Sequence, residues 1–136
     1  MKISFTIDGD PKGKGRPRMC RAGHTYTPRE TAVYENLVRM EYRRQCGENQ
    51  LDGQMRAVIK AYYSMPRSAS KTRRDAMLQG KERPTKKPDL DNVAKIILDS
   101  LNGLAYYDDK NVVDLKIEKW WSDEPRVEVE LEEIRG

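Results

Sequence analysis

Residues 88–104 have the sequence PDLDNVAKIILDSLNGL, which carries the clearest structural signal in the chain. Small and apolar side chains recur there at helical spacing and form one stripe: Val93, Ile96, Ile97, Ser100, Leu101 and Leu104. Asp89 or Asp91 can cap a helix at its start, and Gly103 favours its end. Because an apolar stripe has to be buried, we expect this helix to pack against a sheet formed by the rest of the chain.

Alternation of apolar and polar residues predicts strands on both sides of this helix. Before it, residues 2–8 and 54–65 alternate, and Pro66 ends the second segment. The apolar side of that second strand consists of alternate residues: Met55, Ala57, Ile59, Ala61 and Tyr63. After the helix, residues 111–121 and 126–134 alternate and are separated by a short polar stretch with a proline, which favours a turn. These last two segments are predicted to form a C-terminal hairpin.

Two further helices are predicted. Thr27-Pro28-Arg29-Glu30 has the pattern of a capping box and precedes a helix over residues 28–44, with Val33, Leu37 and Met40 on its apolar face. Ser68 or Ser70 can cap a short helix over residues 68–79, which Gly80 ends. The predicted fold class is α/β (α+β mixed): one domain over residues 1–136, with a mixed β-sheet packed against helices.

Basic residues gather in two stretches of the chain, although the net charge is only +4. Between residues 11 and 23 there is no acid, and five side chains are basic: Lys12, Lys14, Arg16, Arg18 and Arg21. Glycine and proline make residues 11–18 a predicted flexible surface loop. A second basic stretch covers residues 67–87, whereas residues 122–136 are mainly acidic. This asymmetry favours a polyanion on one side of the molecule, with charged, solvated loops as the alternative explanation.

Several classes of protein are disfavoured by composition. Cys20 and Cys46 have neither the number nor the spacing of a disulfide framework or a zinc site, and His24 is the single histidine. No apolar run has the roughly 18 residues that a membrane span needs. We therefore expect a cytoplasmic protein that does not enter membranes.

Carboxylates flank the central helix at both ends. Asp89 and Asp91 lie one residue apart where an extended segment enters the helix, and Lys95 follows Asp91 by one turn. A second acidic pair, Asp108-Asp109, precedes the next strand, and a short return of the chain would bring it beside the first pair. Two carboxylates about 4 Å apart repel by roughly 4 kcal/mol at an effective dielectric constant near 20, so converging carboxylates favour a bound cation.

The alternative explanation of these carboxylates and of Lys95 is a purely structural role. An acidic residue at a helix start is often only a cap that interacts with the helix dipole, and Lys95 can pair with Asp91 or Asp99 at i,i+4 spacing. Hard oxygen ligands otherwise suit Mg²⁺, with Mn²⁺ as a substitute, and such an ion can activate water and polarise a phosphodiester. A calcium-binding EF-hand is excluded because Ala94 and Ser100 occupy the positions that require Gly and Glu.

The string Pro88-Asp89-Leu90-Asp91-Asn92-x-x-Lys95, followed by Asp99-x-Leu101 and Tyr106-x-Asp108-Asp109-x-x-Val112, resembles the signature of the RusA family of Holliday-junction resolvases. Upstream, Gly9-x-Pro11-x-x-Lys14-x-Arg16-Pro17-Arg18 and Tyr26-Thr27-Pro28 resemble motifs of its phage-borne members. The resemblance covers most of the chain and is weakest over residues 68–83.

This resemblance implies a RusA-like fold and a metal-dependent endonuclease. It implies that Asp89, Asp91 and Asp109 bind Mg²⁺ and act in catalysis together with an essential Lys95. It also implies a homodimer that nicks symmetric strands of a four-way DNA junction, in phage or prophage recombination and DNA repair. The predicted phosphate-binding residues are Lys12, Lys14, Arg16, Arg18, Arg21, Lys86 and Lys87.

Three alternatives stay open at the level of sequence. The chain could be a non-enzymatic, basic DNA-binding protein whose acidic residues only cap and turn the chain. It could be a small interaction protein that binds a partner through its acidic C-terminal segment. It could also be a less selective nuclease that cuts many branched DNAs, because no residue pattern measures discrimination between junction shapes.

Overall fold

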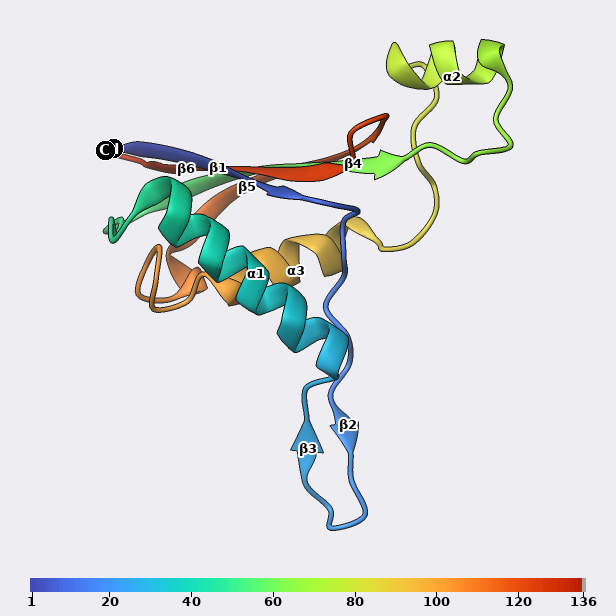
Figure 1. The fold of residues 1–136 in the computed structure, drawn as a ribbon. Coiled ribbons are helices and arrows are strands. Elements are labelled where there is room, and N and C mark those ends of the chain that lie inside the picture. Colours follow the sequence, from blue (N-terminus) through green and yellow to red (C-terminus); the bar gives the residue numbers. More distant parts are fainter. Residues whose placement is uncertain (136) are drawn as a thin grey trace.

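A mixed four-stranded sheet forms the centre of the protein (Figure 1). The computed structural model describes residues 1–135, except for the side chains of Arg18 and Tyr26. The strands are β1 (Lys2–Asp8), β4 (Met55–Ser64), β5 (Val112–Ser122) and β6 (Arg126–Glu133), in the order β1-β6-β4-β5. β4 and β5 are parallel, and the other neighbours are antiparallel. The predicted fold class, a mixed sheet packed against helices, is therefore confirmed.

The predicted C-terminal hairpin is wrong, because β5 and β6 do not pair with each other. β4 lies between them, parallel to β5 and antiparallel to β6. The long segment between β4 and β5, which contains two α-helices, provides the crossover that a parallel pair requires. Alternation along β5 and β6 identified both strands correctly, but it carries no information about which strand each one pairs with.

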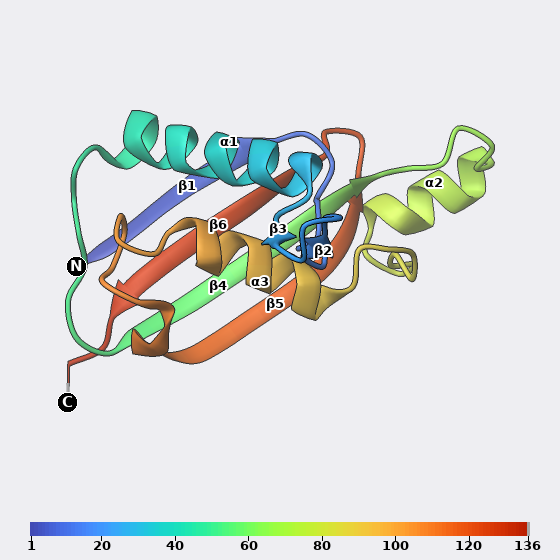
Figure 2. The ribbon, with the colours of Figure 1, turned by 90° about the horizontal axis from the view of Figure 1, so that it is seen from below.

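One face of the sheet is covered by α1 (Arg29–Cys46) and α3 (Leu90–Ser100), as Figure 2 shows. The predicted stripe of α3 is buried from Val93 to Leu101, with Leu104 packed at its margin. The predicted inward residues of β4, from Met55 to Tyr63, are at most 1% exposed. No helix in the described residues is long and apolar enough to cross a membrane.

The buried face of α1 differs from the predicted one. Thr31, Tyr34, Val38 and Tyr42 are buried, whereas the predicted face with Val33, Leu37 and Met40 is exposed. The two tyrosines have more apolar area to bury than valine or methionine, which explains this rotation of the helix. The predicted capping box is also absent: Pro28 is the N-cap residue and makes no side-chain capping bond.

Ser70 is the N-cap residue of α2 (Lys71–Leu78), and its hydroxyl accepts a hydrogen bond from the Arg73 N–H. Ser70 is one of the two predicted caps of this helix. The helix lies beyond the end of β4, on the other side of the sheet from α1 and α3 (Figure 1). The segment that follows α2 is held to the sheet through Trp120 of β5, because the Arg83 guanidinium stacks 3.8 Å from the centre of the Trp120 ring. The neighbouring Trp121 faces the opposite side and is buried, as the alternation of a strand requires.

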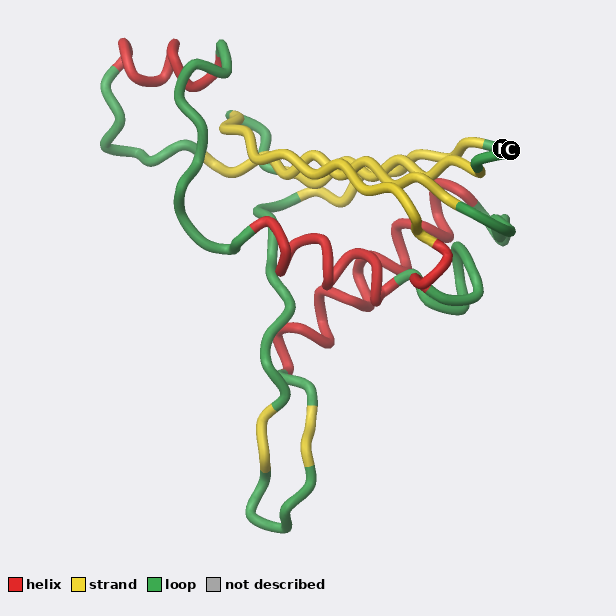
Figure 3. Tube along the Cα trace, turned by 180° about the vertical axis from the view of Figure 1, so that it is seen from behind, coloured by secondary structure: helices red, strands yellow, loops and turns green. Residues whose placement is uncertain are grey.

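Residues 11–17 have no regular secondary structure, as predicted, but the segment is less exposed than a surface loop would be. Pro11 is buried and residues 13–15 are half-buried, because the segment runs between α1 and α3. It then continues into a short hairpin, β2 (Arg18–Met19) and β3 (Thr25–Tyr26), that projects from the helix layer (Figure 3). Sequence patterns did not predict this hairpin.

Candidate active site

The N-terminus of α3 presents the first acidic pair to solvent. Asp89 is the N-cap residue, with extended backbone angles of φ −70° and ψ 155°, but its carboxylate makes no capping hydrogen bond. Asp91 lies in the first turn, and both side chains are exposed. The purely structural explanation of Asp89 as a helix cap is therefore not supported, and its carboxylate is available to a ligand.

A groove of about 650 Å³ opens beside this helix start. We call it the basic groove. It is lined by Asp10, Pro11, Lys12, Gly13, Lys14, Arg16, Tyr63, Lys86, Lys87, Pro88, Asp89 and Asn92. Five of these side chains are basic and two are acidic, so the groove brings both basic stretches of the sequence against the Asp89 carboxylate.

Tyr63 connects strand β4 to this groove. Its hydroxyl donates a hydrogen bond to the Pro88 carbonyl at 2.6 Å, which ties the segment before α3 to the end of β4. Burial, together with the charge of Asp89, raises the pKa of Tyr63 to about 12. The phenol therefore stays protonated and acts as a donor that fixes the entry to α3.

Asp91, Lys95 and Asp99 form a row on the solvent-facing side of α3, one turn apart; we call it the α3 row. Within the described part of the chain, Lys95 makes no ion pair with either aspartate of the row. Asp99 is paired instead with Lys14, at 3.4 Å. The Lys95 ammonium is thus exposed, and the alternative role of Lys95 as the partner of a helical ion pair is not supported.

The second acidic pair lies at the C-terminal end of α3. The Asp109 N–H donates to Asn102 Oδ1 at 2.8 Å, whereas the Asp108 carboxylate accepts the N–H of Lys110 and caps a short 3₁₀ helix, η1 (Asp109–Asn111). Burial and the nearby carboxyls of Asp108 and Asp99 raise the pKa of Asp109. Asp108 therefore has a structural role, whereas the Asp109 side chain lies beside the carboxyls of Asp108 and Asp99.

Asp109 does not lie beside Asp89 and Asp91. It adjoins Asp99, eight residues after Asp91 and about 12 Å further along the helix at 1.5 Å per residue. Among residues 1–135, no group of three Asp, Glu, His or Cys side chains is close enough to hold a metal ion. The carboxylates thus form a line along α3, and their catalytic and metal-binding roles stay predictions.

The predicted phosphate-binding residues fall into distinct environments. Lys12, Lys14, Arg16, Lys86 and Lys87 line the basic groove. Arg21 is exposed near the tip of the β2–β3 hairpin, and the side chain of Arg18 lies outside the described residues.

Lys14 differs from the other basic residues because its Nζ is 2.7 Å from Glu35 Oε2, while its side chain is only 20% exposed. Although burial acts in the opposite direction, Glu35 and Asp99 raise the pKa of Lys14. Sequence reasoning missed Glu35, because nothing in the pattern of α1 distinguishes it from other surface glutamates.

These features define an α+β protein with a basic groove and carboxylates along one helix. The chain matches the family Endodeoxyribonuclease RusA over residues 8–132 and belongs to that family. It is also 39% identical over 137 residues to the Uncharacterized protein YqaN of Bacillus subtilis (strain 168), covering 97% of this chain and 96% of that protein. Family membership indicates a nuclease that hydrolyses DNA.

Proposed function

We propose that this nuclease is a Mg²⁺-dependent, structure-selective endonuclease that resolves Holliday junctions by paired symmetric nicks. The protein would be of prophage origin and would act in DNA recombination and repair. The observation that supports this proposal is the basic groove, whose lining contains five basic side chains together with Asp89 at the start of α3. Positive charge would hold the phosphate backbone there, next to the groups that cleave it.

Lys12, Arg16, Lys86 and Lys87 would bind the DNA through its phosphates. Contacts of this kind position DNA without specifying its sequence, as a nuclease that recognises the shape of a junction requires. Both basic stretches line the groove together with Asp89, so a strand held between them would pass close to that carboxylate.

Asp89 and Asp91 are the residues that would hold the metal. Mg²⁺ commonly keeps several waters and binds one or two carboxylates together with substrate phosphates. The acidic pair at the start of α3 fits that requirement, because both side chains are exposed and Asp89 makes no side-chain capping bond. Mn²⁺ accepts the same oxygen ligands. When bound, the ion would supply an activated water and a polarised phosphodiester.

Lys95 and Asp109 complete the proposed machinery along the α3 row. The exposed Lys95 ammonium would stabilise negative charge that develops on the phosphorus oxygens. Asp109, beside Asp99 at the far end of the row, would act from there on a strand that follows the helix.

The exposed stripe of α1 supports a homodimer. Val33 is 60%, Leu37 37% and Met40 64% exposed, in successive turns of one helix. An isologous dimer presents identical sites to equivalent strands of a junction.

The cytoplasm, where thiols such as Cys20 and Cys46 stay reduced, is the proposed compartment.

Cleavage of a labelled four-way junction, beside linear duplex of the same sequence, tests the activity. We expect paired symmetric nicks in the junction with Mg²⁺, none with chelator, and a loss of about three orders of magnitude in Asp91→Asn. Asp75→Asn, an exposed aspartate of α2, is the matched control and should cleave like the wild type.

Two outcomes would redirect the assignment. Tight junction binding without cleavage by the wild type would leave a non-enzymatic DNA-binding protein. Equal cutting of flaps, forks and junctions would leave a less selective nuclease for branched DNA.

Sedimentation of Leu37→Glu tests the dimer. A charge in the middle of the α1 stripe should convert a wild-type dimer into monomers, whereas Leu78→Glu, at an exposed leucine of α2, should leave the dimer intact. A wild-type monomer at assay concentration would contradict this part of the proposal.

A further inference from the structure

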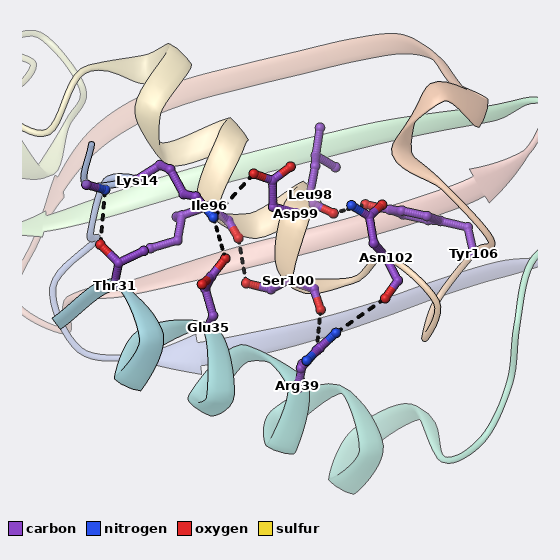
Figure 4. Close-up of polar contacts among 11 residues, drawn as sticks. Lys14, Thr31, Glu35, Arg39, Ile96, Leu98, Asp99, Ser100, Asn102 and Tyr106 are labelled. Carbon is purple, nitrogen blue, oxygen red and sulfur yellow. Dashed lines mark hydrogen bonds and ion pairs between the residues drawn. The ribbon is translucent and has the colours of Figure 1, made fainter. Parts of the chain in front are cut away.

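The side chain of Lys14 lies where its own loop, residues 11–17, meets α1 and α3, as Figure 4 shows. Its ammonium lies 2.7 Å from Glu35 of α1 and 3.4 Å from Asp99 of α3. The two carboxylates are themselves only 20% and 28% exposed. At these distances and with this shielding from water, the lysine is committed to the protein rather than to a ligand in the groove.

The backbone around Lys14 is held just as closely. The Lys14 N–H donates to the Asn92 carbonyl at 3.1 Å, and the Gly15 N–H donates to Thr31 Oγ1 at 3.0 Å. A Cβ atom on Gly13 would lie 2.9 Å from the Cβ of Pro88, so the chain can approach α3 this closely only because residue 13 is glycine. Residues 13–15 are therefore held between α1 and α3 by hydrogen bonds from their backbone N–H groups to both helices.

Lys14 also completes the electrostatics of the acidic end of α3. Asp99 adjoins Asp109, and two neighbouring carboxylates repel each other unless a cation or a proton lies between them. The Lys14 ammonium on Asp99 is the cation that the chain itself supplies, and α1 holds it there through Glu35.

We propose that Lys14 is a positioning residue: it fixes Asp99 and, through it, the Asp109 carboxylate, while it joins the DNA-binding loop to the α3 row. This inference rests on the proposed nuclease function, in which Asp109 takes part in cleavage. It separates Lys14 from Lys12, two residues earlier in the same loop, which is exposed and lines the basic groove without such a pair of carboxylates.

Matched variants distinguish the two kinds of lysine. Junction affinity is measured in chelator over a range of salt concentrations, and single-turnover cleavage is measured at saturating protein with Mg²⁺. Lys14→Gln should keep wild-type affinity and salt dependence but cleave about ten- to a hundredfold more slowly, because a small displacement of a catalytic group has effects of this size. Lys14→Arg should restore much of the rate. Lys12→Gln should weaken binding and lower the salt slope by about 0.9.

Glu35→Gln provides an independent test if Lys14→Gln does not fold. It removes one partner of the lysine from the α1 side and should slow bound-state cleavage without changing affinity. Lys116→Gln, on the exposed side of β5, should behave like the wild type in both assays.

The inference is overturned if Lys14→Gln loses affinity and salt slope as Lys12→Gln does while its saturated cleavage rate is unchanged. It is also overturned if Lys14→Gln and Glu35→Gln both cleave at the wild-type rate. Failure of the proposed function looks different, because the wild type would then cleave no junction at all.

Discussion

Asn102 holds Asp109 in place across the end of α3: its side-chain Oδ1 accepts the Asp109 N–H at 2.8 Å. The Asn102 backbone is in turn fixed to α1, because Arg39 donates from Nε to the Ser100 carbonyl at 2.8 Å and from Nη2 to the Asn102 carbonyl at 3.4 Å. The position of Asp109 therefore depends on a chain of hydrogen bonds that starts on another helix.

Asn102→Ala should slow junction cleavage about tenfold or more and lower the free energy of unfolding by about 1 kcal/mol, the usual contribution of one hydrogen bond. The measurements are single-turnover cleavage at saturating protein and denaturant unfolding. Gln50→Ala, which removes an exposed side-chain amide from a loop, is the matched control. Wild-type cleavage by a folded Asn102→Ala protein would show that Asp109 does not need this bond.

Two valines of α1 test which face of the helix is buried. Val38 is 0% exposed and Val33 is 60% exposed. Val38→Ala should lower the free energy of unfolding by about 2 kcal/mol, through lost burial and the cavity left behind. Val33→Ala should change it by less than about 0.5 kcal/mol. Urea unfolding at low protein concentration measures both; equal effects would mean that the two faces are buried alike.

The groove should set the salt dependence of DNA binding. Lys86→Gln/Lys87→Gln removes two charges from its wall and should lower the slope of log affinity against log salt by about 1.8. The double variant Lys2→Gln/Lys116→Gln removes the same charge from the far side of the sheet and should leave the slope unchanged. Fluorescence anisotropy with a four-way junction gives both slopes, and equal slopes would mean that DNA does not use the groove.

Asp10 should make stability depend on pH in the acid range. Its carboxylate accepts the Ser64 N–H at 2.9 Å; although burial opposes the shift, this bond and the charges of Lys86 and Lys12 lower the pKa of Asp10. A lowered folded-state pKa gives stability that is present above the unfolded pKa and lost as pH falls through the folded pKa.

Asp10→Asn should therefore be less stable than the wild type at about pH 6, and the difference should shrink towards about pH 3. Denaturant unfolding of both proteins across this range measures the effect. Asp123→Asn, at an exposed aspartate, should follow the wild type throughout. A difference between Asp10→Asn and the wild type that does not vary with pH would contradict the assigned cause.

Local patterns predicted most of the elements because each depends on neighbours in sequence. The stripe of α3 and the alternation of β4 have one buried side each, so their periods report burial directly. Ser70 as a cap and Asp89 at the helix start follow from the same short-range rules. Sequence motifs between Gly9 and Val112 also identified the family, and they lie within the residues 8–132 that match it.

Tertiary contacts decided what no local pattern contains. Strand alternation could not show that β4 separates β5 from β6, since pairing depends on the crossover through α3. Two apolar faces compete on α1, and only packing selects the tyrosines of one over the valine and methionine of the other.

The candidate site divides in the same way. Its residue types were readable from the sequence, because chemistry limits which side chains bind phosphate and metal. Their arrangement was not: Lys14 lies 21 residues before Glu35 and 85 before Asp99, yet the fold brings the three together. Asp109 is placed at the far end of α3 by Asn102. Sequence determined which groups the protein has, and only the three-dimensional path of the chain determined which of them meet.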